Sequence, residues 1–179
     1  YRRSWGDVLF ALVVIALGIY GGMKNRALMD VYEEVILVGT VLTVIALGWF
    51  WRPLRTLMLA VTGFSFWRIV SYQGNLANAD SVFWLKYFLS SQSAILWMSM
   101  LFFMSTIFYW IGMFASRQGD AMSLVASKLA WVAVGMALIG TMVRWYESYL
   151  VGADVGHIPV SNLYEVFVMF CWMTAAFYL

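Results

Sequence analysis

The sequence predicts an all-α polytopic membrane protein: a transmembrane helical bundle of about six membrane-spanning helices plus one interfacial helix. Of its 179 residues, 64% are apolar and only 11% are charged. Soluble domains are about half apolar and a quarter charged. A chain of this length cannot hide so much apolar surface in one aqueous core, because small domains bury a limited fraction of their area. Lipid is therefore the solvent that this composition requires.

The positions of the spans follow from the apolar runs, since a helix needs about 20 mainly apolar residues to cross a hydrocarbon core of about 30 Å. The run from Ala94 to Ala115 contains no charged residue. Pro53 is well placed to open the third helix. The predicted spans are Trp5–Met23, Val35–Trp51, Leu54–Tyr72, Ala94–Ala115, about Leu124–Tyr149, and a last one that begins near Leu163.

Two further patterns bear on packing. Between the third and fourth spans, apolar and aromatic residues gather around Lys86, which is typical of a helix that lies in the membrane interface. These residues are Val82, Phe83, Trp84, Leu85, Tyr87, Phe88 and Leu89. In the first span, Gly18 and Gly22 have the spacing that lets a second helix approach closely.

The net charge and the small numbers of cysteine and histidine residues argue against several classes of function. The net charge is +2 and the basic residues form no block, which argues against nucleic-acid binding. The single cysteine, Cys171, can form neither an internal disulfide nor a redox CxxC pair. A Ser-His-Asp triad or a histidine-rich metal cluster has only His157 to draw on.

The basic residues near the helix ends predict the orientation. Arg2 and Arg3 precede the first span and the short turn at 52–55 is basic, so we expect the N-terminus to be cytoplasmic and the His157 loop to be external. We treat residues 1–179 as one transmembrane domain. Because the chain starts at Tyr1 and its last apolar run continues to Leu179, we expect it to be the N-terminal part of a longer protein.

Three charged or titratable positions are candidates for a site. Arg144 and Glu147 lie about one turn apart, and we expect an interfacial ion pair, the alternative being a functional charge at membrane depth. Arg68 is expected to extend toward the headgroups, although its planar donors suit a propionate or phosphate. His157 is either a hydrogen-bonded turn residue or a group that ligates iron or moves protons.

One segment resembles a known family. The stretch GHIPVSNLYE, Gly156 to Glu165, followed at once by an apolar run, is similar to the early signature of the cytochrome c biogenesis membrane proteins of the Ccs/ResC type, which act in system II cytochrome c maturation. The surrounding stretch Arg144–Phe170 resembles that family as well, and the segment Leu85–Ser99 resembles its bacterial branch.

The resemblance implies a role in handling haem. Such proteins work with a ResB-like partner in the bacterial inner membrane to present haem outside for attachment to apocytochrome c, as part of a cytochrome c haem lyase complex. It implies haem as cofactor, with His157, Asn162, Arg144 and Arg68 as residues that could contact it. The family's tryptophan-rich WWD segment and its flanking histidines do not occur here, so the principal haem ligands are expected outside this chain. The metal ligands are therefore unknown.

Other functions stay open. The main alternative is a non-catalytic structural membrane subunit of a respiratory or photosynthetic complex, and a small-solute transporter ranks after it. A local role for the signature is also predicted. Pro159 disfavours helix before it, and Ser161 or Asn162 can cap the last helix. Its first amides would then face an anion such as a propionate, unless Glu165 satisfies them itself.

Overall fold

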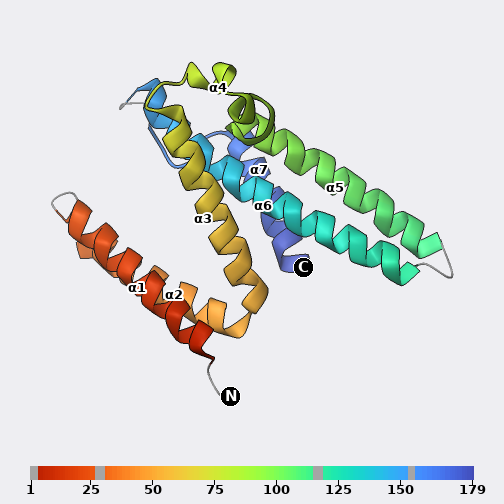
Figure 1. The fold of residues 1–179 in the computed structure, drawn as a ribbon, viewed down its shortest axis with the longest axis horizontal. Coiled ribbons are helices and arrows are strands. Elements are labelled where there is room, and N and C mark those ends of the chain that lie inside the picture. The colour runs from red at the N-terminus through yellow and green to blue at the C-terminus, as the bar shows by residue number, and fades with distance from the viewer. Residues whose placement is uncertain (1–3, 27–30, 115–118, 153–155) are drawn as a thin grey trace. The chain divides into compact units, whose positions relative to one another are not determined.

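The computed structural model describes residues 4–26, 31–114, 119–152 and 156–179, and all regular structure in these ranges is helical (Figure 1). The predicted all-α fold is thus confirmed. The elements are α1 (Trp5–Asn25), α2 (Val31–Phe50), α3 (Arg52–Tyr72), α4 (Asn78–Ser81), the π-helix η1 (Leu85–Leu89), α5 (Ser91–Phe114), α6 (Gly119–Val151) and α7 (Leu163–Tyr178).

The number of membrane spans is confirmed only in part. Three helical stretches are long and apolar enough to cross a bilayer: Trp5–Met23, Ser91–Phe114 and Ala121–Val151. The apolar parts of α2 and α7, Glu34–Phe50 and Leu163–Tyr178, are shorter. The third predicted span, α3, has Pro53 in its first turn as expected but also carries Arg52, Arg55 and Arg68, and such charges are unfavourable in hydrocarbon.

The chain packs as two compact units, residues 1–59 and residues 60–179, with the boundary inside α3. Each unit is described by itself. That the whole chain is one transmembrane domain remains a prediction.

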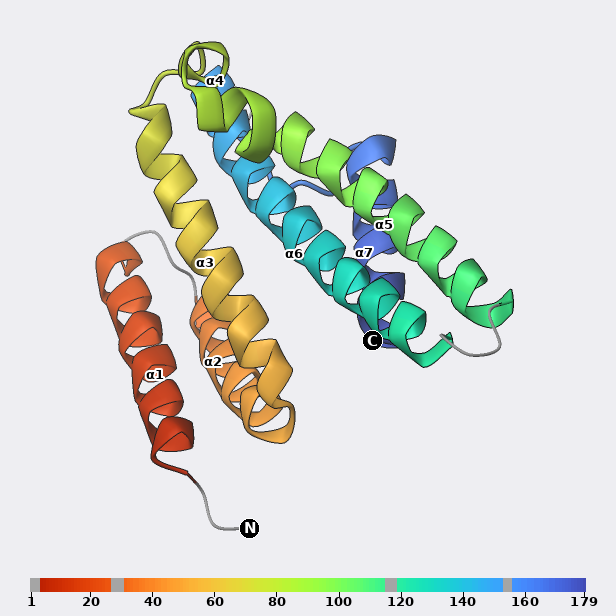
Figure 2. The same cartoon turned by 45° about the vertical axis from the view of Figure 1, so that its right-hand side comes forward.

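In the first unit, α1 and α2 form an antiparallel hairpin (Figure 2). Glycines allow the two backbones to approach, as the spacing of Gly18 and Gly22 predicts. A Cβ atom added to Gly18 would lie 2.5 Å from Val41 Cγ2, and one added to Gly22 would lie 3.3 Å from Leu37 Cδ2. At the other end of the hairpin, a Cβ at Gly48 would lie 2.3 Å from Phe10 Cε1.

An ion pair joins the hairpin to the start of α3. Arg55 Nη2 lies 2.6 Å from Asp7 Oδ1, and Arg55 Nε donates to the Gly48 carbonyl at 2.5 Å. Asp7 also accepts a hydrogen bond from the Ser4 amide at 2.8 Å, and Trp49 Nε1 donates to the Asp7 carbonyl at 2.9 Å. These contacts satisfy polar groups that lipid cannot hydrogen-bond.

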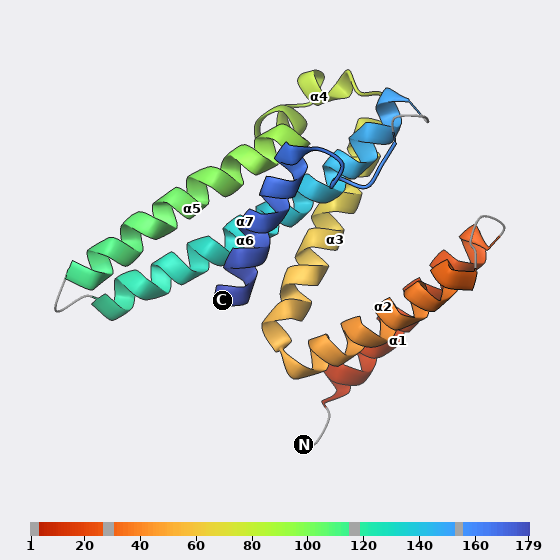
Figure 3. The same ribbon diagram turned by 180° about the vertical axis from the view of Figure 1, so that it is seen from behind.

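In the second unit, α5 and α6 run side by side and α7 packs on α6 (Figures 1 and 3). Small residues line the α6 face toward α5 at helical spacing, which lets the helices pack closely. The buried ones are Ala126, Ala130, Ala133, Ala137 and Gly140. A Cβ at Gly140 would lie 3.1 Å from Ile95 Cγ1 and 3.2 Å from Ala94 Cβ, and Ser105 Oγ donates to the Ala126 carbonyl at 2.8 Å.

The segment around Lys86 that is predicted to lie in the interface contains the π-helix η1, which follows the short helix α4. Its two faces differ in exposure: Leu85 and Leu89 are buried, whereas Phe83, Trp84 and Tyr87 are more than half exposed. The rings of Phe88 and Trp97 stack at 5.5 Å, which ties η1 to the start of α5. A position in the membrane interface remains the prediction for this aromatic face.

The packing at Gly140 makes a testable prediction. Gly140→Leu should weaken the α5–α6 pair, lowering the free energy of unfolding in detergent by about 1–3 kcal/mol, because the added side chain must displace Ile95 and Ala94. Gly63→Leu on α3 is the matched control, since nothing lies within 4 Å of a Cβ added there. Equal thermal unfolding midpoints for the two variants would contradict close packing at Gly140.

Candidate functional site at the end of α6

Most of the buried polar residues described in the second unit lie on or beside the C-terminal part of α6. We call the set Arg144, Glu147, Ser148, His157 and Glu165, with the residues that bond to them, the α6-end cluster. Arg144, Glu147 and Ser148 stand at i, i+3 and i+4 of α6, so they share one face of the helix end. Glu147, Ser148 and Glu165 are all buried.

Arg144 bonds to α7. Its Nε lies 3.3 Å from Glu165 Oε1, with the Arg144 side chain 39% exposed and that of Glu165 only 3% exposed. The expected ion pair between Arg144 and Glu147 is wrong. The two residues are one turn apart, but α7 brings the Glu165 carboxylate to Arg144, while Glu147 is taken by other donors.

Glu147 joins three helical segments. Its carboxylate accepts hydrogen bonds from the Tyr72 hydroxyl at the end of α3 and from Ser91 at the start of α5. The Ser91 amide lies 3.1 Å from Oε1 and the Ser91 hydroxyl 2.5 Å from Oε2. The Tyr72 ring also lies 6.0 Å from that of Tyr146. Burying a carboxylate is costly unless several donors replace water, and these three contacts meet that requirement.

The segment with the family resemblance is held to α6 by backbone contacts. The His157 amide donates to Ser148 Oγ at 3.3 Å, and the Gly156 amide donates to the Gly152 carbonyl at 3.1 Å. Gly156 packs on Tyr149 so closely that an added Cβ would lie 2.2 Å from Tyr149 Cδ1. Glycine is therefore the residue that fits at this position of the segment.

The start of α7 has the predicted cap. Asn162 is the N-cap, and its Oδ1 accepts from the Glu165 amide at 2.9 Å. Glu165 Oε2 accepts in return from the amide and the hydroxyl of Ser161, both at 3.2 Å. This is a variant of the capping box, shifted by one residue. The Asn162 side chain and Glu165 thus occupy the end of α7 that an external anion would otherwise meet.

His157 lies beside this cap. Its Nε2 is 3.6 Å from Glu165 Oε2, and its side chain is 37% exposed. Arg144, His157 and Asn162, three residues predicted to contact a cofactor, therefore meet around Glu165. The sequence pattern predicts Glu165 only as a competitor for the helix amides, and no local pattern marks Tyr72, Ser91 or Ser148 as members of a site.

Arg68, the fourth predicted residue, lies apart from Glu165 on α3, one turn before Tyr72. The expectation that it extends to the headgroups is wrong, because its side chain is fully buried. Its Cζ lies 5.5 Å from the Trp67 ring centre, and none of its guanidinium nitrogens has a hydrogen-bond partner. It shares a buried face of α3 with Val61, Ser65 and Tyr72, at helical spacing.

The space in the cluster limits what it can bind. A cavity of about 10 Å³ lies between Arg144, Pro159 and Glu165, at the lower limit for one water molecule. Sites for organic ligands and cofactors are far larger, about 300–1,000 Å³. This cavity is therefore too small for a haem group. Among the described residues, no group of three or more His, Cys, Asp or Glu could hold a metal ion.

Comparison of the chain with protein-family models, with curated proteins and with solved structures gave no match.

The cap at α7 can be tested with Glu165→Gln. An amide in place of the carboxylate loses the charge-assisted bond to Arg144 and sets a donor against the donors of Ser161. We expect the free energy of unfolding in detergent to fall by about 1.5–3 kcal/mol. Asp80→Asn, an exposed acidic residue in the first turn of α4, is the control. An unchanged unfolding midpoint for Glu165→Gln would argue against the cap.

The contact between α3 and α6 gives a second prediction. Tyr72→Phe removes one donor from the buried Glu147 carboxylate and should destabilise the protein by about 1–3 kcal/mol. Tyr32→Phe, on an exposed tyrosine of α2, controls for the loss of a hydroxyl as such. In a chemical-denaturation series, Tyr72→Phe combined with Ser91→Ala should lose more stability than either variant alone. Wild-type stability in the double variant would contradict the Glu147 network.

Proposed function

We propose that this protein is a membrane component of cytochrome c assembly, which handles or exports haem and presents it for attachment to apocytochrome c outside the membrane. The observation that carries the proposal is the segment Gly156–Glu165, whose residues resemble the Ccs/ResC-type signature. The geometry supports a defined role for that segment, because it is anchored at both ends: to Ser148 of α6 and to the cap of α7.

The chain's own residues would act from the surface of the α6-end cluster. Since the enclosed cavity is too small for haem, a contact has to be made by side chains that are partly exposed. His157 and Arg144 meet this condition, with more than a third of each side chain exposed. Glu165 holds the Arg144 side chain and lies next to the imidazole, so it would orient both. When bound, haem supplies the reactivity toward the thiols of apocytochrome c.

The other two residues predicted to contact haem, Asn162 and Arg68, are less suited to a first contact with it. The Asn162 side chain is engaged as the α7 cap, so its contribution would be to position the segment. Arg68 retains its full set of donors, which suits a carboxylate such as a propionate, but it is covered by protein. We therefore place the first contact at His157 and Arg144.

The proposal includes a location and partners. Three membrane-length apolar helices make this a membrane protein. We propose the bacterial inner membrane, a cytoplasmic N-terminus and an external His157 loop, on the basic residues near the helix ends. A ResB-like membrane protein and apocytochrome c are the proposed partners, and the principal haem ligands are proposed to lie outside this chain.

A structural membrane subunit of a respiratory or photosynthetic complex is the second candidate. The observation that favours it is that Arg144, Ser161, Asn162 and Glu165 satisfy one another's hydrogen bonds. Such a closed set of contacts can serve to fix the direction of α7 without any ligand.

The test separates the two candidates. In cells that make the full-length protein and its partner, His157→Ala should lower the yield of haem-stained cytochrome c severalfold, because an exposed imidazole at the proposed contact is lost. The purified wild-type protein should show reduced haem bands after dithionite, weakened in the variant. Ile158→Ala, at a neighbouring exposed residue, is the matched control.

Protein stability has to be followed in the same variants. If His157→Ala matures cytochrome c normally and its haem spectrum is unchanged, the segment is structural and the second candidate stands. If the wild-type protein and its partner carry no haem at all, the haem-handling proposal is wrong.

A further inference from the structure

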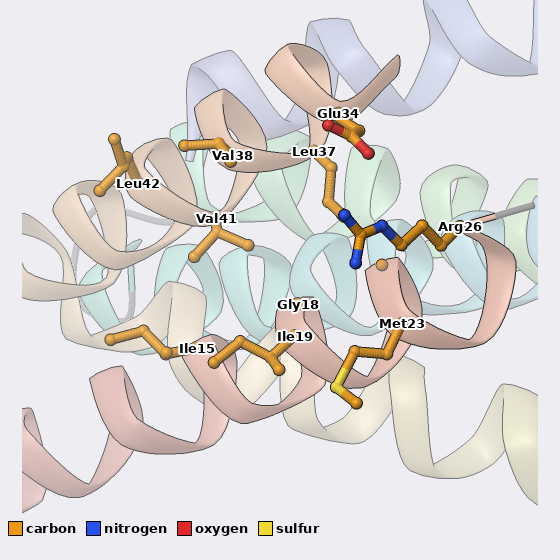
Figure 4. Close-up of a pocket in the computed structure, with 11 residues that line it drawn as sticks. Ile15, Gly18, Ile19, Met23, Arg26, Glu34, Leu37, Val38, Val41 and Leu42 are labelled. Carbon is orange, nitrogen blue, oxygen red and sulfur yellow. The ribbon is translucent and has the colours of Figure 1, made fainter. Parts of the chain in front are cut away.

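A groove between α1 and α2 lies within the first unit and plays no part in the proposed haem function (Figure 4). Its volume is about 430 Å³, within the range of ligand sites. The lining is apolar along its length and charged at one end. The lining residues are Ile15, Gly18, Ile19, Gly22, Met23 and Arg26 from α1 and its end, and Glu34, Leu37, Val38, Val41 and Leu42 from α2.

The glycines shape this groove. Gly18 and Gly22 bring the α1 backbone against Val41 and Leu37, so the floor is shallow and closed. In Figure 4 the larger side chains, such as Ile19 on α1 and Val38 on α2, stand on either side of this floor. The result is a narrow apolar channel that runs along the hairpin.

The length of the groove matches one leaflet of a bilayer. The candidate span of α1 is Trp5–Met23, so Ile15 lies near its middle and Met23 at its end. The helix rises about 12 Å between these two residues, close to half of the hydrocarbon thickness of about 30 Å. In a bilayer centred on this span, the groove would extend from the bilayer centre to the headgroup level, which is the path of one acyl chain.

The charged end carries both signs. Arg26 directly follows α1 and Glu34 lies in the first turn of α2. Both are exposed, and among the ion pairs between described residues none joins them. In Figure 4 the Arg26 side chain extends from the end of α1 toward α2, where Glu34 is located. A guanidinium suits a phosphate, and a carboxylate suits a primary ammonium group.

We propose that the groove binds a phospholipid of the phosphatidylethanolamine type. One acyl chain lies along the apolar floor, Arg26 contacts the phosphate, and Glu34 accepts from the ammonium group. A purely anionic lipid matches Arg26 but is repelled by Glu34. The groove covers only half of α1 and ends in opposite charges, which favours a lipid over a packed helix from a second copy or another protein.

The binding test uses delipidated protein in detergent and native mass spectrometry. Phosphatidylethanolamine, phosphatidylglycerol and phosphatidylcholine with identical acyl chains are added in turn. We expect one tightly retained phosphatidylethanolamine. Phosphatidylglycerol lacks the ammonium group, and the methyl groups of phosphatidylcholine block its hydrogen bonds to Glu34, so both should bind more weakly.

Two charge variants assign the headgroup contacts. Arg26→Gln should weaken phosphatidylethanolamine and phosphatidylglycerol alike, by about fivefold. Glu34→Gln should weaken phosphatidylethanolamine but leave phosphatidylglycerol no weaker than before. Arg52→Gln, at an exposed arginine that begins α3 in the same unit, should change neither.

A matched pair of tryptophan variants tests the groove itself. Ile19 and Leu17 lie on the same helix and are 58% and 59% exposed, but only Ile19 lines the groove. Ile19→Trp should abolish retention of phosphatidylethanolamine, and Leu17→Trp should leave it intact. If Ile19→Trp fails to fold, the two charge variants decide.

Three results would overturn the proposal. Equal retention of all three lipids by wild-type protein would remove the headgroup selectivity. A preference for phosphatidylglycerol would make the site one for anionic lipids. A dimer that Ile19→Trp converts to a monomer, with no lipid retained in either form, would make a second copy the occupant.

Discussion

Two buried carboxylates, Glu147 on α6 and Glu165 on α7, hold the second unit together at the end of α6. Neither is exposed enough for water to replace its partners, and lipid offers no hydrogen bonds at all. Each carboxylate therefore requires hydrogen-bond donors from the protein. Glu147 receives them from the end of α3 and the start of α5. Glu165 receives them from α6 and from the cap of α7. The positions of four helix ends follow from this requirement.

Close helix packing in both units depends on small side chains. Lipid is as apolar as the helix surfaces, so helices associate by van der Waals contact and by burying polar groups rather than by a hydrophobic driving force. The alanine and glycine face of α6 allows α5 to pack closely on it, and the glycines of α1 and α2 allow these two helices to pack closely on each other. In the hairpin the same glycines have a second consequence, because the close approach leaves the apolar groove beside the backbone contact.

The segment Gly156–Glu165 combines positions of two kinds. Three of its residues make structural contacts within the chain: Gly156 packs on Tyr149, Asn162 caps α7, and Glu165 binds Arg144. His157 is fixed through its backbone amide, and its side chain is 37% exposed although its Nε2 atom is buried. The haem proposal therefore concentrates on this one side chain and on the exposed part of Arg144, with the rest of the segment as their support.

The sequence by itself determined the features that depend on local contacts. Apolar runs placed the helices, and Asn162 could be predicted as a cap because it bonds to an amide three residues away. The glycine spacing in α1 predicted a close helix contact without naming the partner. Only the tertiary structure decided the pairings across long separations: Arg144 with Glu165 instead of Glu147, and Glu147 with Tyr72 and Ser91. Arg68 was expected at the headgroups and is buried. These outcomes depend on the rotation of each helix about its own axis, which decides the side chains that face a neighbouring helix. The sequence pattern does not specify this rotation, because any side of an apolar helix can face either lipid or another helix.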